Sequence, residues 1–247
     1  MAVTPVRKCD CTAPRGGLVE ETVSESTNGD TAMAERHDAI AEDKRRLRTK
    51  IRRARRRLNP EARRVRDGEI QCRMLAHLAE TMEGAGSSGA AGSLQLATVL
   101  AFAPMEGEPG GTALPQVLSS AGYQVLLPRI DERTLEPTLL WVPFRGPGDL
   151  ACNRLGIPEP QGQPVPDWRA TDVAAAIVPA LAIDGEGIRL GQGGGFYDRV
   201  FASSAGARPY VIGLVGSDEL VDEVPSTCWD MRVDAAVTPA GVQRFGK

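Results

Sequence analysis

The segment of the chain with the most evident chemistry is rich in glycine: four of the five residues from 191 to 195 are Gly. Because glycine has no Cβ and adopts positive φ readily, such a backbone can turn several amides toward one phosphate group. Arg189 and Arg199 flank the segment, and Asp198 supplies the carboxylate oxygen that Mg²⁺ prefers. This combination indicates an enzyme that uses a nucleotide.

Two common glycine motifs are excluded by the residues that follow. A dinucleotide-binding fingerprint needs a third glycine where Phe196 or Asp198 stands, depending on the register. A Walker loop needs Gly-Lys before Ser or Thr, whereas the one Gly-Lys pair ends the chain at Lys247. A flexible connection between a strand and a helix is the structural alternative. The neighbouring arginines, aromatic residues and aspartate favour a function.

Length and composition are typical of a globular enzyme. The chain has 247 residues, of which 42% are hydrophobic, and this suits one sizeable domain or two small ones. No run approaches the roughly 18 consecutive apolar residues of a membrane helix, and the N-terminus lacks the apolar core of a secretory signal. The five cysteines are scattered, so neither a disulfide framework nor a zinc site is indicated. We therefore expect a cytoplasmic location and no membrane association.

Positive charge is concentrated in one segment. Between Lys44 and Arg73 lie fourteen Lys or Arg and three Asp or Glu, although the net charge of the chain is -3. Such a segment attracts polyanions, which include nucleic acid, nucleotide phosphates and a polyglutamylated substrate. It contains no aromatic residue on which a base could stack, so only electrostatic binding to a nucleic-acid duplex remains as that alternative.

The N-terminal third predicts an extension followed by two helices. Residues 1–36 have the composition of a disordered extension. Helix-forming residues with apolar positions at helical spacing predict a helix over 38–58. Asn59 and Pro60 then supply a cap and a first-turn proline for a second helix that ends before Gly84. Residues 84–93 are nearly all Gly, Ala and Ser, typical of an insertion or linker within a single domain over 37–247.

Strands and helices alternate in the rest of the chain. Strands are expected at 96–102, 123–127, 139–144, 173–179, 210–215 and 235–238, and helices at 112–121 and 197–203. The prolines around 139–144 indicate an edge strand, and 173–179 a central one. The predicted fold class is α/β, a three-layer, mostly parallel sheet with helices on both faces, preceded by the two N-terminal helices. Ligands of such sheets bind beyond the carboxyl ends of the strands, where the glycine-rich segment follows 173–179.

The order of several short motifs carries a family resemblance. Lys44-x-x-x-Arg48 comes first; short clusters follow at 102–108 and 128–129, each after a strand, and at 156–160. The most specific motif is Arg-Leu-Gly-x-Gly-x-Gly-Phe-Tyr-Asp at 189–198. From Lys44 to Pro239, the chain resembles the 5-formyltetrahydrofolate cyclo-ligase family, also called 5,10-methenyltetrahydrofolate synthetase.

The resemblance implies a ligase of folate one-carbon metabolism. Its expected reaction converts 5-formyltetrahydrofolate to 5,10-methenyltetrahydrofolate with ATP and Mg²⁺, and releases ADP and phosphate. The formyl oxygen attacks the γ-phosphate, and the folate N10 then closes the ring. Phosphorylation suits this chemistry, because it converts a poor leaving group into a good one while the protein supplies positioning and charge neutralisation.

The resemblance also implies which residues meet ATP and the metal. Lys44 and Arg48 would contact phosphates from neighbouring i,i+4 positions on one helix face, and Lys44 and Arg189 are the expected catalytic residues. Asp198 and Asp230 would hold Mg²⁺. The other residues expected to bind ATP are Leu190, Gly191, Gln192, Gly193, Gly194, Gly195, Phe196 and Tyr197.

For the folate, the resemblance implies a carboxylate and an aromatic wall. Glu108 would accept hydrogen bonds from the pterin, whose N–H edge needs a paired acceptor. Met105 and Phe196 would line the pterin face, and Arg129 and Tyr197 are expected near the site. The loop residues expected to touch the substrate as well are Gln192, Gly193, Gly194 and Gly195.

Some expectations keep their alternatives. One common form of the family motif has lysine where this chain has Gly194, so charge neutralisation is expected from Arg189, Lys44, Arg48 and the metal. Lys44 and Arg48 also fit a solvated helix face, and Glu108 a turn. The rival functions are a nucleic-acid-binding protein that uses residues 44–73, and an ATP phosphotransferase with another acceptor. The expected partners are reduced folate and ATP, without nucleic acid; we expect a monomer, with a homodimer as the alternative.

Overall fold

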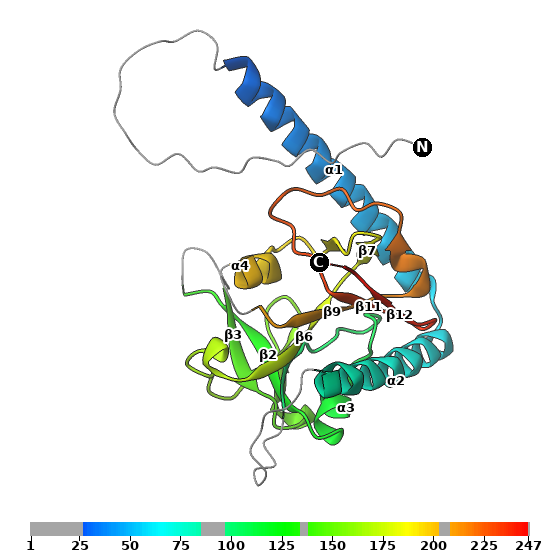
Figure 1. Cartoon of the computed structure of the whole chain (residues 1–247), viewed down its shortest axis with the longest axis vertical. Coiled ribbons are helices and arrows are strands. Elements are labelled where there is room, and N and C mark those ends of the chain that lie inside the picture. Colours follow the sequence, from blue (N-terminus) through cyan, green and yellow to red (C-terminus); the bar gives the residue numbers. More distant parts are fainter. Residues whose placement is uncertain (1–26, 85–96, 134–137, 203–207, 247) are drawn as a thin grey trace.

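The computed structural model describes residues 27–84, 97–133, 138–202 and 208–246. Two long N-terminal helices come before a sheet that two short helices flank (Figure 1). The helices are α1 (Thr27–Arg57), α2 (Pro60–Gly84), α3 (Leu114–Ser120) and α4 (Phe196–Ala202). The predicted insertion at 84–93 lies outside the described residues, except for Gly84, which ends α2.

The boundary between α1 and α2 follows the predicted capping signal. Asn59 Oδ1 accepts a hydrogen bond of 2.8 Å from the Ala62 N–H, and Pro60 opens α2 at the position where its missing N–H costs nothing. The start of α1 differs from the prediction, because the helix begins at Thr27 rather than near residue 38. Residues 27–36, which we assigned to the extension, are therefore helical. Once a helix has nucleated, adding residues at its end costs little, and Ala, Met, Glu and Arg in this segment favour it.

The central sheet has seven strands in the order β12-β11-β9-β6-β1-β2-β3. Its five inner strands pair in parallel, and the two edge strands β3 and β12 pair antiparallel. The predicted edge strand is β3, and the predicted central strand is β6. The strands are β1 (Thr98–Leu100), β2 (Gln124–Asp131), β3 (Thr138–Pro143), β6 (Val173–Pro179), β9 (Tyr210–Leu214), β11 (Ala235–Val237) and β12 (Val242–Arg244).

The side chains of each strand alternate between the two faces of this sheet, and each face carries a layer of buried apolar residues. Ile177 of β6 packs on one face with Met74 of α2 and Leu118 of α3. Val178, the next residue, packs on the other face with Phe201 of α4. Successive strand residues point to opposite faces, so a nearly continuous apolar strand fills both layers. The predicted three-layer α/β architecture with helices on both faces is confirmed.

Short strands outside the central sheet were not predicted. β7 (Ala182–Asp184), β8 (Arg189–Leu190) and β10 (Leu220–Val221) form a three-stranded sheet in the order β10-β7-β8. The Pro- and Gly-rich segment between β3 and β6 contains the 3₁₀ helix η1 (Pro147–Asp149) and a two-stranded sheet of β4 (Leu150–Cys152) and β5 (Pro158–Pro160). Two- and three-residue strands carry too little periodicity to be recognised in a sequence.

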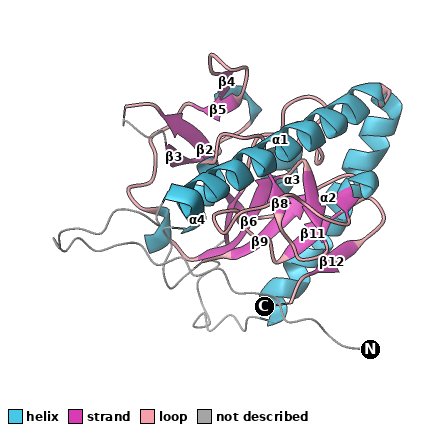
Figure 2. Ribbon diagram, turned by 90° about the horizontal axis from the view of Figure 1, so that it is seen from above, coloured by secondary structure: helices cyan, strands magenta, loops and turns pink. Residues whose placement is uncertain are grey.

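The second half of α1 lies across the small sheet. Ile51 is 4% exposed and packs with Leu181, Leu190 and Val224. Figure 2 shows α1 crossing over the strands, while its N-terminal half extends beyond the body in Figure 1. Within the described residues, no helix combines the length and hydropathy needed to cross a membrane.

One buried ion pair holds α1 in register. Arg55 donates from Nε to Glu219 Oε1 at 2.7 Å and from Nη2 to Oε2 at 2.8 Å, and Nη2 also donates to the Ala180 carbonyl at 2.6 Å. Glu219, in the 3₁₀ helix η3 (Ser217–Glu219), also accepts the Gly216 N–H. Both side chains are less than a tenth exposed. A bidentate pair at this depth fixes the rotation and the height of α1 above the sheet.

We predict that Arg55→Ala lowers the free energy of unfolding by about 3–5 kcal/mol, because it leaves the Glu219 carboxylate buried without its cation. Urea denaturation followed by circular dichroism measures the loss. The matched control is Arg56→Ala, which removes the same charge from an exposed position on α1 and should change stability by less than about 0.5 kcal/mol. Equal effects of the two substitutions would refute the role assigned to Arg55.

A histidine is enclosed between α2 and the far edge of the sheet. His77 is 2% exposed; its Nε2 lies 3.2 Å from the Tyr210 hydroxyl and its Nδ1 lies 3.4 Å from Arg244 Nη2. Since arginine can only donate, Nδ1 is the acceptor and the neutral ring carries its proton on Nε2. Burial, and then the charge of Arg244, lower the pKa of His77 below 6.5, although Glu80 acts in the opposite direction.

Because the folded protein disfavours protonation of His77, its stability should decrease as the pH falls. Below pH 6.5 the unfolded chain binds a proton at residue 77 that the folded chain resists, so the free energy of unfolding falls as pH falls from 6.5. We predict that His77→Gln flattens this slope between about pH 7.5 and pH 5.5. Urea titrations of both proteins across that range measure it, and parallel pH profiles would contradict the prediction.

Candidate active site

A cavity opens where the carboxyl ends of the strands meet α1. It has a volume of about 450 Å³. Pro128 of β2 and Pro179 at the end of β6 contribute to its floor, as expected for the ligand crevice of a mostly parallel sheet. The predicted site residues that line it are Lys44, Arg48, Met105, Glu108, Asp230 and all ten residues from Arg189 to Asp198.

The glycine-rich segment connects β8 to α4 along one wall of the cavity. Gly193 has φ +109° and Gly195 has φ +65°, conformations that side chains with a Cβ rarely adopt. Gly191 has ordinary φ, but a Cβ there would lie 2.7 Å from Arg189 Nη1. A Cβ at Gly194 would lie 2.7 Å from Phe196 Cε2. A side chain at position 194 would therefore require the Phe196 ring to shift.

Arg189 and Asp198 form a pair at the two ends of this segment. The Arg189 side chain is 3% exposed; Nη2 lies 3.0 Å from both Asp198 oxygens, and Nη1 donates to the Pro179 carbonyl at 3.0 Å. The guanidinium lies 5.7 Å from the centre of the Tyr197 ring. Burial raises the pKa of the Tyr197 hydroxyl far above its ordinary value, although Arg189 acts in the opposite direction. Tyr197 therefore keeps its proton at neutral pH and can donate a hydrogen bond.

Lys44 and Arg48 project from α1 into the cavity. Lys44 Nζ lies 2.6 Å from both Asp230 oxygens, and Asp230 also accepts the N–H and the hydroxyl of Thr227. Arg48 Nε donates to the Gly191 carbonyl at 2.9 Å. Burial, and then the neighbouring charge of Arg52, lower the pKa of Arg48. This end of the cavity is crowded with cations and would favour an anionic ligand.

Glu108, the carboxylate that the sequence predicts to contact the substrate, is only 9% exposed. Its Oε2 accepts the Met105 N–H at 3.0 Å, and its Oε1 accepts Gln192 Nε2 at 2.9 Å. Arg66 of α2 holds the same loop by donating to the Glu108 carbonyl at 3.1 Å. Glu108 is thus a cavity-lining carboxylate with two hydrogen-bond donors, and its backbone also forms a turn, since its N–H donates to the Met105 carbonyl at 3.0 Å.

Asp198 and Asp230 belong to neighbouring parts of the cavity. The N–H of Met231, the residue after Asp230, donates to Asp198 Oδ1 at 3.1 Å. The described residues contain no cluster of three or more His, Cys, Asp or Glu that could hold a metal by themselves. Two carboxylates nevertheless suit Mg²⁺, which takes few protein ligands and completes its shell with water and phosphate oxygens. Each carboxylate carries a cationic partner here, Arg189 or Lys44.

Sequence reasoning left several cavity residues out of the site. Arg129, expected near the site, does not line the cavity itself, although its neighbours Pro128 and Ile130 do, and it donates to the carbonyls of Pro160 and Gly162. The cavity residues that were given no role in the site are mostly apolar: Phe102, Ala103, Pro128, Ile130, Leu139, Leu155, Ile157, Pro158, Glu159 and Pro179. Six of them lie in the short clusters at 102–108, 128–129 and 156–160, so the sequence had marked their segments but not their contact with the cavity. Arg199 stacks on Phe196 at 5.3 Å and does not line the cavity as Arg189 does.

Comparison with known proteins decides the family. The profile of the 5-formyltetrahydrofolate cyclo-ligase family matches residues 40–239, most of the chain. The chain belongs to this family. The cyclo-ligase profile covers α1 from its middle onward and every cavity residue named above.

Curated cyclo-ligases agree with this assignment. A 5-formyltetrahydrofolate cyclo-ligase of Mycolicibacterium smegmatis is 38% identical over 186 residues, which cover 74% of this chain and 88% of the relative. One of Escherichia coli K12 is 32% identical over 145 residues, or 59% of this chain and 79% of the relative. The predicted enzyme class, a ligase of folate metabolism, is confirmed.

Solved structures of similar proteins agree as well. A 5,10-methenyltetrahydrofolate synthetase of Aquifex aeolicus is 29% identical with a TM-score of 0.55, and the match covers 83% of this chain and 93% of the other. One of Mycoplasma pneumoniae has a TM-score of 0.56 at 17% identity, covering 80% and 99% of the two chains. The second likeness supports the cyclo-ligase fold alone.

The contact between Gly191 and Arg189 yields a prediction. Gly191→Ala should lower the free energy of unfolding by about 1–3 kcal/mol, because the methyl group displaces the buried guanidinium from Asp198 and the Pro179 carbonyl. Urea denaturation measures it. Gly185→Ala is the control, since a Cβ at Gly185 meets nothing within 4 Å. A stability of Gly191→Ala equal to that of the control would show that the loop has more room than described.

Proposed function

We propose that the chain converts 5-formyltetrahydrofolate to 5,10-methenyltetrahydrofolate with ATP and Mg²⁺, and releases ADP and phosphate. The observation that carries the proposal is that three groups line one cavity: the glycine loop (residues 191–195), the cations Lys44 and Arg48 of α1, and the Glu108 carboxylate. The family supplies the reaction class. The geometry supports a nucleotide half and a folate half that share the glycine loop as their boundary.

The nucleotide half would be the cationic end of the cavity. Lys44 and Arg48 lie one helical turn apart on the face of α1 that meets the glycine loop. Amides of Gly191 to Gly195 would donate to phosphate oxygens, and positive φ at Gly193 and Gly195 permits their turn. Lys44 and Arg189 would neutralise charge that develops on the transferring phosphoryl group.

Asp198 and Asp230 would hold the magnesium ion that accompanies ATP. Asp230 would then exchange its ammonium partner for the metal, which leaves Lys44 to contact phosphate. Arg189 would keep Asp198 oriented from below, since its second nitrogen is fixed on the Pro179 carbonyl. When bound, Mg²⁺ supplies charge neutralisation on the phosphate oxygens.

The folate half would be the apolar end, which Glu108 closes. Glu108 would accept N–H groups of the pterin, because each carboxylate oxygen can accept more than the one bond it makes here. Met105 and Phe196 would contact the pterin face, and Leu139 and Ile157 extend the apolar wall. This placement brings the formyl group of the folate toward the glycine loop.

The chemistry would need positioning more than a strong base. The formyl oxygen attacks the γ-phosphorus of ATP and the bond to ADP breaks, which leaves an imidate phosphate on N5. N10 then attacks the formyl carbon and the ring closes; phosphate leaves with the former formyl oxygen, and the N10 proton is released with it. Holding both substrates in one cavity makes these steps effectively unimolecular and provides much of the rate enhancement.

The test is direct. Protein, ATP, Mg²⁺ and 5-formyltetrahydrofolate are mixed and the absorbance band of methenyltetrahydrofolate is followed, with ADP release measured in parallel. We expect the band and ADP to form together, and both to require Mg²⁺. Absence of the band would refute the proposal. If ATP is consumed faster with a different acceptor in a substrate panel, that acceptor and not the folate would be the substrate.

A single carboxylate tests the folate half. We predict that Glu108→Gln raises KM for 5-formyltetrahydrofolate by about tenfold or more, because an NH₂ donor replaces one of the two acceptor oxygens, while KM for ATP changes little. The control is Glu106→Gln in the same loop, whose carboxylate is 89% exposed and pairs with Arg63. Steady-state kinetics of both variants decide the matter: equal KM values would place the pterin elsewhere.

A further inference from the structure

Gln192 connects the two halves of the cavity. Its side-chain nitrogen Nε2 donates to Glu108 Oε1 at 2.9 Å. Its side-chain oxygen Oε1 accepts two donors of Arg52, Nη2 at 2.7 Å and Nε at 3.2 Å. Arg52 Nη2 also donates to the Gln192 carbonyl at 3.1 Å. A continuous chain of hydrogen bonds therefore runs from α1 through the glycine loop to the loop after β1.

The chemistry of the two end groups fixes the orientation of the Gln192 amide. An arginine only donates, so it selects the amide oxygen, and a carboxylate only accepts, so it selects the amide nitrogen. Turning the amide over would place oxygen against oxygen at Glu108 and nitrogen against nitrogen at Arg52. Arg52 thus determines which group Gln192 presents to Glu108, although Arg52 does not line the cavity itself.

The direction of the Glu108 carboxylate depends on this contact. Its Oε2 is held by the Met105 N–H from its own loop, and its Oε1 by Gln192 alone among the bonds to described residues. Without Gln192 the carboxylate would be free to rotate about its Oε2 contact. A ligand that pairs with both oxygens binds best when both are already oriented.

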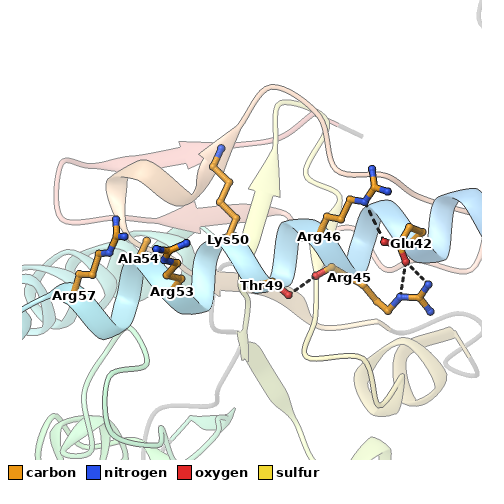
Figure 3. Close-up of a pocket in the computed structure, with 8 residues that line it drawn as sticks. All are labelled: Glu42, Arg45, Arg46, Thr49, Lys50, Arg53, Ala54 and Arg57. Carbon is orange, nitrogen blue, oxygen red and sulfur yellow. Dashed lines mark hydrogen bonds and ion pairs between the residues drawn. The ribbon is translucent and has the colours of Figure 1, made fainter.

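Arg52 lies on the face of α1 that contacts the glycine loop. It follows Lys44 and Arg48 by whole helical turns, toward the glycine loop. Arg53 has the same charge but belongs to the outer stripe with Arg45, Arg46 and Arg57, shown in Figure 3. The two neighbours differ only in the face of the helix on which they lie. Comparing their substitutions therefore separates the effect of the charge from the effect of the contact with Gln192.

We propose that Arg52 is a positioning residue for the folate, which acts through Gln192 to orient Glu108 and so couples the nucleotide loop to the folate. The inference rests on the proposed function and deepens it. A nucleotide that orders the glycine loop strengthens folate binding through the same hydrogen bonds, and by linkage the folate strengthens nucleotide binding equally.

The experiment measures binding of 5-formyltetrahydrofolate by isothermal titration calorimetry, with and without a non-hydrolysable ATP analogue. In Arg52→Ala we expect the Kd for the folate to rise about fivefold and the strengthening by the analogue to disappear. Arg53→Ala should match the wild type in both respects. Arg52→Lys should remain weakened, because an ammonium cannot reproduce the fork that holds both Oε1 and the carbonyl of Gln192.

A double-mutant cycle separates positioning from direct contact. In a Gln192→Ala background, Arg52→Ala should not weaken folate binding further, since its route to Glu108 is already cut. Three results would overturn the inference: equal effects of Arg52→Ala and Arg53→Ala, full rescue by Arg52→Lys, or an undiminished effect of Arg52→Ala in the Gln192→Ala background. A wild-type protein that binds no folate would instead refute the proposed function, and with it the basis for the inference.

Discussion

The arrangement of the cavity depends on the buried ion pair between Arg55 and Glu219. An isolated helix with as much positive charge as α1 has little reason to lie against a sheet, and its apolar contact with the small sheet is narrow. The bidentate pair, with the Ala180 carbonyl as a third contact, gives the helix one rotation and one height. Every side chain that α1 extends toward the glycine loop takes its position from that anchor, in steps of one turn.

The site is built from charges that already have partners. Lys44 pairs with Asp230 and Arg189 with Asp198, so two cations and two anions satisfy one another within one cavity. Without these pairs, four partly buried charges would carry a large desolvation penalty. Under the proposed function, phosphate would replace carboxylate at the cations and a metal would replace the cations at the carboxylates. The charges that a metal–nucleotide complex would need are thus already present in the cavity as neutralised pairs.

The overall order of strands and helices was predicted from the sequence more completely than the short strands and the side-chain contacts. Val173–Pro179 was predicted with its bounds because it is a long apolar run, and the cap at Asn59 because its signal lies within three residues. The strands β7, β8 and β10 were missed because two or three residues have no period. The Gly191–Gly195 loop could be found from its composition, whereas the pairing of Lys44 with Asp230 joins residues 186 positions apart and depends on packing. The fixed amide of Gln192 likewise follows from three elements meeting, which no local pattern encodes.

The close approach of residue 194 to the ring of Phe196 has a consequence for the loop. Gly194 has no unusual φ, and the atoms nearest to the position of a Cβ there belong to the aromatic ring, 2.7 Å away. A side chain at position 194 is therefore opposed by the present rotamer of Phe196 and not by the backbone. Turning the ring aside would make room for that side chain, at the cost of the contact between the ring and Arg199.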